Sequence, residues 1–125
     1  EAYIRTQAPP DSGVYTPTLS NTTNIAASTA FQCQWMRVGS VVTVSGKVTI
    51  DATTTATFSV LGMTLPIASN IGAVEDLAGV AFCGSIASMG AEIIGVVAND
   101  TAKVQWVSTD ITEQTWSYTY SYEIL

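Results

Sequence analysis

The sequence contains no histidine, and it has only four basic and ten acidic side chains among 125 residues. Histidine is the side chain that most often moves protons at neutral pH, so its absence removes the usual general base. Four scattered bases cannot form the positive patch that binds phosphates, which argues against nucleic acid as a partner. No apolar run reaches the roughly 18 residues of a membrane-spanning helix, so we expect no membrane insertion.

Cysteine is also scarce, since the chain has only Cys33 and Cys83. Two cysteines without a histidine cannot make a familiar zinc site, and we predict neither a metal nor a cofactor. Cys33 alternates with Phe31 and Trp35, as a small buried apolar side chain would. We favour two buried thiols. A single disulfide bridge between them remains the alternative, because the sequence does not fix the distance between the two sulfurs.

Hydroxyl side chains supply the polarity that charges do not, because the chain has eighteen threonines and twelve serines. Threonine is β-branched and suits a half-exposed strand better than a helix. Residues 1–12 contain Pro9-Pro10 and show no regular period, so they are expected to form a linker or N-terminal arm. Residues 13–125 then form one β domain, with short Val, Ile, Thr and aromatic runs separated by Gly, Asn, Asp and Ser.

The clearest hairpin pairs residues 30–38 with 41–50 across Gly39-Ser40, a dipeptide that suits a type II′ turn. A second hairpin is predicted around residues 99–101, where Asn and Asp favour a turn. The last strand alternates strictly, with one face made of Trp116, Tyr118, Tyr120, Tyr122 and Ile124. Further strands are expected near 14–19, 55–61, 63–67 and 77–86, and one helical turn is expected at 72–77.

About seven to nine short strands without helices predict an all-β fold, and we expect an antiparallel β-sandwich of jelly-roll type. The same alternation predicts which side chains form its core. These are Phe31, Trp35, Val42, Val44, Val48, Ile50, Phe58, Val96, Val104, Trp106, Tyr118 and Tyr120.

Several strand and turn segments resemble modules at the C-terminal ends of tailed-bacteriophage fibre and spike proteins. They are SGVYTPTL (12–19), CQWMRVGSVVTVSGKVTI (33–50), LPIAS (65–69) and the closing YTYSYEIL. The resemblance spans residues 13–125 and includes no reactive site. It implies a virion-surface module, made in the bacterial host cytoplasm, that assembles as a homotrimer and contacts the bacterial surface.

Three functions compete on this basis. The first is a receptor-binding tip that holds a bacterial surface polysaccharide. The second is a structural virion part, such as a head fibre, decoration protein or trimerising cap, that binds only other virion proteins. The third is a carbohydrate-binding module of a secreted enzyme. Because rigid strands present binding loops at their ends, the predicted ligand-binding residues are Asn99, Asp100, Asp110, Glu113 and Trp116.

Catalysis is not expected. A glycosidase needs two carboxylates across a groove, whereas the acids of this chain lie mainly in or beside predicted turns. Neither cysteine nor any serine has a predicted base beside it. Glu75-Asp76 lacks the acid-rich spacing of a calcium loop, so it is interpreted as a solvated turn.

Overall fold

The structure is a computed structural model that describes residues 11–86 and 89–125. These residues form an antiparallel sheet of ten strands and one short 3-10 turn, which confirms the all-β prediction. Within the described ranges, no helix has the length and apolarity needed to cross a membrane. The elements are β1 (Ser12–Tyr15), β2 (Leu19–Thr23), β3 (Ile25–Ala30), β4 (Cys33–Val38), β5 (Val41–Ala52), β6 (Phe58–Met63), η1 (Val74–Asp76), β7 (Leu77–Cys83), β8 (Gly90–Val96), β9 (Thr101–Val107) and β10 (Gln114–Glu123).

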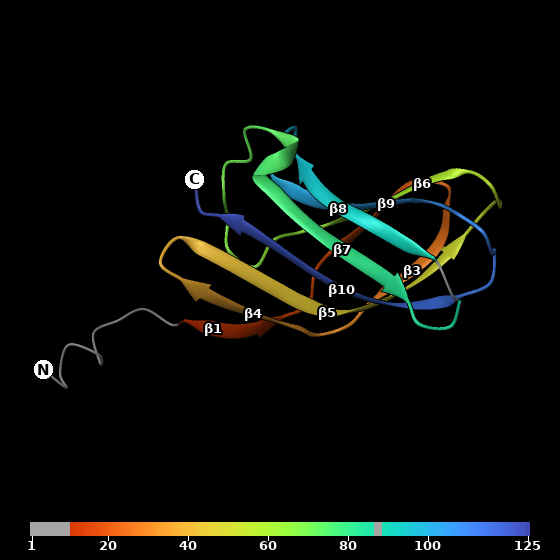
Figure 1. Cartoon of the computed structure of the whole chain (residues 1–125), viewed down its shortest axis with the longest axis horizontal. Coiled ribbons are helices and arrows are strands. Elements are labelled where there is room, and N and C mark those ends of the chain that lie inside the picture. Colours follow the sequence, from red (N-terminus) through yellow and green to blue (C-terminus); the bar gives the residue numbers. More distant parts are fainter. Residues whose placement is uncertain (1–10, 87–88) are drawn as a thin grey trace, which may run out of the picture.

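The strands lie in the order β1-β4-β5-β10-β7-β8-β9-β6-β2, and β3 also pairs with β5. The sheet curls into a half-barrel, with β5, β10 and β7 running side by side through its middle (Figure 1). Hydrogen-bonded ladders join all ten strands into one sheet. The finer expectation, a jelly-roll sandwich of two sheets, is therefore not established by this strand order and stays a prediction.

The predicted hairpin at Gly39-Ser40 is present. Val38 lies opposite Val41, and Gly39 has a φ of +60°, as the first central residue of a type II′ turn requires. The second strand of this hairpin, β5, is twelve residues long and is shared by two neighbours on one side. β4 pairs with its first half and β3 with its second half.

Proline explains why two of the predicted strands differ from those observed. The expected strand at 14–19 is divided by Thr16-Pro17 into β1 and β2. The expected strand at 63–67 does not form, because β6 ends at Met63 and Pro66 lacks a backbone donor. The backbone of Ile67 instead bonds the Tyr122 hydroxyl, which accepts from its N–H at 3.2 Å and donates to its carbonyl at 2.8 Å.

The core fills the inside of the curl, and its large side chains on β10 face small ones on both neighbouring strands. Tyr118 lies opposite Gly46 of β5 and Ala81 of β7, and Tyr120 lies opposite Gly79. A Cβ added at Gly79 would lie 2.4 Å from the Cβ of Tyr120 and 2.6 Å from its Cα, so this glycine lets β7 approach the main chain of β10 closely. The rings of Tyr118, Tyr120 and Tyr122 stack along β10, with centroids 6.2 and 6.1 Å apart.

Most predicted core positions are confirmed, and Phe58 is wrong. Phe58 is 52% exposed, because the next residue, Ser59, faces inward together with Leu61. The polar Ser59 takes the inward position that the prediction gave to Phe58. Of the other predicted positions, three are half-buried, namely Phe31, Trp35 and Val96, and the remaining eight are buried, namely Val42, Val44, Val48, Ile50, Val104, Trp106, Tyr118 and Tyr120.

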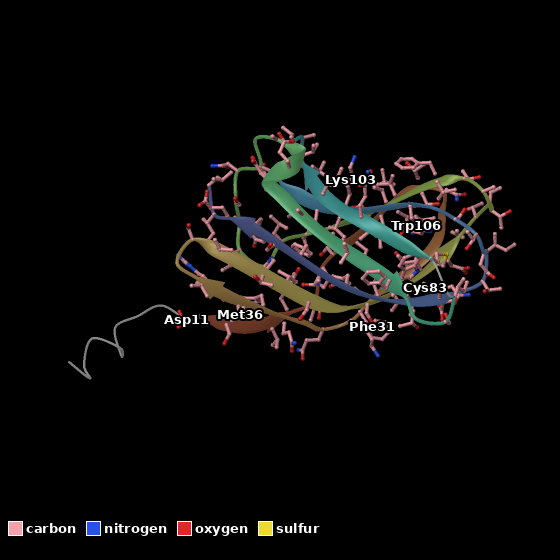
Figure 2. All side chains as sticks on the ribbon, in the orientation of Figure 1. Asp11, Phe31, Met36, Cys83, Lys103 and Trp106 are labelled. Atoms are coloured by element: carbon pink, nitrogen blue, oxygen red, sulfur yellow. The ribbon has the colours of Figure 1, made fainter. Side chains whose placement is uncertain are left out.

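Both cysteines are buried and unbridged, as favoured from the sequence. The Cys33 thiol donates to the Tyr15 carbonyl at 3.4 Å, beside Gly46 of β5. Cys83 ends β7, opposite Trp116, near the right-hand end of the molecule in Figure 2.

Candidate functional site

The two loops predicted to bind a ligand lie at opposite ends of β9. Asn99 and Asp100 immediately precede this strand, and the loop of residues 110–113 follows it. Seven strand residues separate them by about 20 Å. The two loops therefore cannot form one site, and each is described separately below.

The Asn99-Asp100 turn is built by its own side chains. Asp100 has a φ of +57°, a conformation that Asn and Asp tolerate better than most residues. One carboxylate oxygen of Asp100 accepts a hydrogen bond from the Ile71 N–H at 2.9 Å. The side-chain oxygen of Asn99 accepts from the Thr101 hydroxyl at 2.6 Å. The turn is thus tied to the segment that precedes η1.

That neighbouring segment, residues 64–71, is fixed by bonds to the C-terminal end of the chain. The buried Ser69 hydroxyl donates to the Glu123 carbonyl at 2.8 Å and accepts from the Leu125 N–H at 2.9 Å. From the core side, the Tyr122 hydroxyl bonds both the N–H and the carbonyl of Ile67. A segment without regular structure is therefore held by side chains of the sheet, as a preformed binding loop would be.

Between the turn and this segment lies a depression of about 570 Å³, which we call the end depression. Its volume falls in the usual range of small-molecule sites. Polar and apolar side chains contribute to it together. The lining residues are Thr64, Leu65, Pro66, Ala68, Ser69, Asn70, Asn99, Asp100, Thr101 and Leu125.

Three polar groups of the end depression have no hydrogen-bond partner among the described residues. They are the side-chain amide of Asn70, the side-chain NH₂ of Asn99 and the second carboxylate oxygen of Asp100. All three residues are exposed. Amide and carboxylate groups of this kind donate to and accept from hydroxyls, while Leu65 and Pro66 offer apolar surface. The arrangement suits a neutral, hydroxyl-rich ligand.

The loop at the other end satisfies most of its polar groups internally. Asp110 accepts from the N–H of Thr112 at 2.6 Å and from its hydroxyl. These bonds hold the pKa of the Asp110 carboxyl below its usual value, with the Thr112 hydroxyl as the main cause. Gln114 donates to the Thr112 hydroxyl at 2.7 Å, and Glu113 is exposed. This loop is therefore a turn closed by its own side chains.

Trp116 lies in the core, so its ring is not available to a ligand. Only 1% of its surface is exposed, and its ring packs on Trp106 with centroids 5.1 Å apart. Its position follows from the strict alternation of β10, which buries Tyr118, Tyr120 and Tyr122 on the same face. The alternation of β10 therefore places Trp116 in the core.

Among the three residues with free polar groups in the end depression, Asn70 is the one that was not predicted from the sequence. It follows a stretch that was expected to be a strand, and Pro66 within that stretch is the signal that could have shown a loop. The site is thus defined by its own geometry, in which Asn70, Asn99 and Asp100 surround one hollow. Comparison with protein-family models, with curated proteins and with solved structures finds no match to this chain.

Proposed function

We propose that this domain is a surface module of a tailed-bacteriophage virion that binds a bacterial surface glycan in the end depression. The observation that carries the binding proposal is the group of free polar atoms on Asn70, Asn99 and Asp100 around one hollow. Sugars are recognised by such hydrogen-bonding groups together with small apolar surfaces. A single site of this openness binds weakly, and a virion compensates by presenting many copies.

The virion context rests on the resemblance of residues 13–125 to fibre and spike modules. A homotrimer belongs to the same resemblance, whereas the jelly-roll topology was expected from the number of strands, and both stay predictions. A purely structural virion role is the second candidate, and one observation favours it. Four large apolar side chains are exposed together on the outer face of the sheet, namely Phe58, Val80, Phe82 and Val107.

The test is a binding assay on glycan arrays and on whole bacterial cells with the double variant Asn70→Ala, Asn99→Ala. Both side chains are exposed and neither donates or accepts a bond that holds the main chain, so the fold should persist. We expect at least a tenfold loss of binding, because each amide contributes about 1 kcal/mol through its hydrogen bonds. Asp100 is left intact, since its carboxylate holds Ile71.

The matched control is the double variant Asp110→Ala, Glu113→Ala at the opposite end of the sheet. It removes two polar side chains from another loop and should leave glycan and cell binding unchanged. Equal binding by the Asn70, Asn99 variant and the wild type would exclude the end depression. Failure of the wild-type domain to bind any glycan or cell would favour the structural role instead.

A further inference from the structure

Next to the end depression lies a second hollow of about 390 Å³, over β2, β6 and β9, which we call the side groove. The two hollows share Thr64, Asn99 and Thr101 in their linings, so they adjoin. Lys103 of β9 also lines the side groove, and it lies on the upper side of the sheet in Figure 2. A ligand longer than one sugar therefore has a continuous path from the end depression into the side groove.

The floor of the side groove is a glycine between two polar side chains. The register places Lys103 of β9 opposite Gly62 of β6, and Gly62 opposite Ser20 of β2. Adjacent strands lie about 4.8 Å apart, so the backbones of Lys103 and Ser20 are about 9.6 Å apart across this gap. A Cβ added at Gly62 would lie 3.2 Å from the Cβ of Ser20, so a larger residue would narrow the groove. The glycine thus leaves the space between the ammonium and the hydroxyl open.

The ammonium group of Lys103 is half-buried and forms no ion pair or hydrogen bond within residues 11–86 and 89–125. Glu92 lies one diagonal step away on β8, but its carboxylate accepts from the Gln105 side chain. The Ser20 hydroxyl likewise has no partner in the described part of the chain. A half-buried charge interacts more strongly with an opposite charge than an exposed one does, because less water screens it. The side groove therefore offers a free positive charge to an anion.

The charges also determine the order in which a ligand's groups fit the two hollows. Asp100 lines the end depression, and Lys103 follows three residues later, which is about 10 Å at about 3.3 Å per residue. The Asp100 carboxylate repels an anion, whereas the Lys103 ammonium attracts one. Neutral sugars therefore suit the end depression, and an acidic group suits the side groove.

We propose that the side groove binds the carboxylate of an acidic sugar between the Lys103 ammonium and the Ser20 hydroxyl, while neutral sugars of the same glycan occupy the end depression. This inference rests on the proposed function and names the class of glycan. One compact ammonium matches a singly charged carboxylate, whereas phosphate sites commonly use an arginine fork or a row of backbone N–H groups. The net charge of −6 repels a densely charged chain, so we expect the acidic sugars to be separated by neutral ones.

The first test compares the wild type with Lys103→Gln on an array that holds pairs of glycans with and without a sugar carboxylate. The wild type should bind the carboxylated member of a pair more strongly. Lys103→Gln should weaken binding to these members about fivefold and leave binding to neutral members unchanged, because it removes only the charge. The melting temperature of this variant checks that it is folded.

Lys47→Gln is the matched control for the removal of one positive charge. Lys47 is exposed on β5, its ammonium lies 4.7 Å from the centre of the Phe31 ring, and it lines neither hollow. This variant should bind both members of each glycan pair as the wild type does.

A second test locates the carboxylate by nuclear magnetic resonance. The probe is a hyaluronan oligosaccharide, in which a carboxylated sugar alternates with a neutral one, and its control is the same oligosaccharide with the carboxyl groups reduced to alcohols. The carboxylated probe should shift the amide signals of Ser20, Gly62 and Lys103. The reduced probe should leave these three signals in place and still shift that of Asn99.

Binding of neutral glycans alone, no binding of any glycan, equal loss in Lys103→Gln and Lys47→Gln, or stronger inhibition by poly(glycerol phosphate) than by hyaluronan would each overturn this inference. Two further outcomes separate it from the proposed function. Loss of binding in the Asn70, Asn99 variant without any change in Lys103→Gln would keep the end depression as the site and overturn only the role of the side groove. Loss of the carboxylate preference in Lys103→Gln, with wild-type binding by the Asn70, Asn99 variant, would exclude the end depression and support the side groove.

Discussion

The three tyrosines of β10 share one buried face, but their hydroxyl groups have different surroundings. The Tyr122 hydroxyl bonds both backbone groups of Ile67. The Tyr120 hydroxyl lies 2.9 Å from that of Tyr15, which also donates to the Thr64 carbonyl. The Tyr118 hydroxyl is buried without a partner among the described residues, because its neighbour, the Cys33 thiol, donates to Tyr15 instead.

This difference predicts opposite effects of removing one oxygen atom. Tyr118→Phe should leave the free energy of unfolding unchanged or raise it by about 1 kcal/mol, since it removes a buried group that lacks a bond. Tyr122→Phe should lower the free energy of unfolding by about 1 to 3 kcal/mol, because it leaves the N–H and carbonyl of Ile67 unpaired. Urea denaturation of the two variants measures both changes. Equal destabilisation would mean that the Tyr118 hydroxyl has a partner after all.

The alternation of side chains along a strand predicted the buried face reliably only where the alternation is strict. On β10 every second residue is aromatic, and the buried face was predicted without error from Trp116 to Tyr122. On β6 the pattern is broken by the inward Ser59, and the prediction of a buried Phe58 is wrong. Alternation also cannot show that Phe82 is exposed, because the inner face of β7 is occupied by small residues that accommodate the rings of β10.

The buried tyrosines of β10 make the stability of the sheet depend on pH in the alkaline range. Burial raises the pKa of Tyr122 from 10.0 to about 12, and it raises the pKa values of Tyr118 and Tyr120 further. Above pH 10 the tyrosines of the unfolded chain lose protons while those of the folded chain keep them. The contribution of these tyrosines to the free energy of unfolding is then constant below about pH 10 and falls as pH rises above 10. The slope is up to about 1.4 kcal/mol per pH unit for each tyrosine.

Melting temperature and tyrosinate absorbance, recorded together against pH, measure this effect. Most of the tyrosinate signal should appear with unfolding rather than near pH 10. The variant Tyr118→Phe serves as the control. Its free energy of unfolding should fall less steeply with pH, by the contribution of one tyrosine. Full ionisation near pH 10 in a chain that remains folded would contradict the burial of these hydroxyls.

The two hairpins could be predicted because each depends mainly on the residues of its own turn. Gly39-Ser40 and Asn99-Asp100 determine their turns through backbone conformations that these residue types favour. The loop at 64–71 was missed, because its conformation is fixed by Tyr122 and Ser69 bonds to residues more than 50 positions away. The same long-range bonds create the end depression, so Asn99 and Asp100 could be predicted as site residues whereas Asn70 could not.

At the scale of the whole molecule, Cys33 and Cys83 report on unfolding from two separate strands. Both thiols are buried, so a thiol reagent should modify them only when the sheet opens. We predict that the two react at the same slow rate, and that this rate accelerates in step with denaturation. Reducing agents should leave the melting temperature unchanged. Quantification of each modified peptide by mass spectrometry distinguishes this result from local opening, in which one cysteine would react much faster.

The order of the strands in the sheet could not be predicted from the sequence. The alternation of each strand shows which face is buried, but it does not show which strand is the neighbour. The long β5 accepts both β3 and β4 on one side, and β10 enters between β5 and β7. Such pairings are decided by the packing of large rings against small residues across strands, which appears only once the register is known.

The central place of β10 has a consequence for the order of events during synthesis. This strand is the last along the sequence, yet it joins the two arms of the sheet, since β5 pairs with it on one side and β7 on the other. Until Gln114 to Glu123 have been translated, the β1-β4-β5 arm and the arm that begins at β7 lack a common neighbour. Nascent chains would therefore carry exposed apolar faces for several seconds at ordinary elongation rates. The two arms can therefore join into one sheet only once β10 has been made.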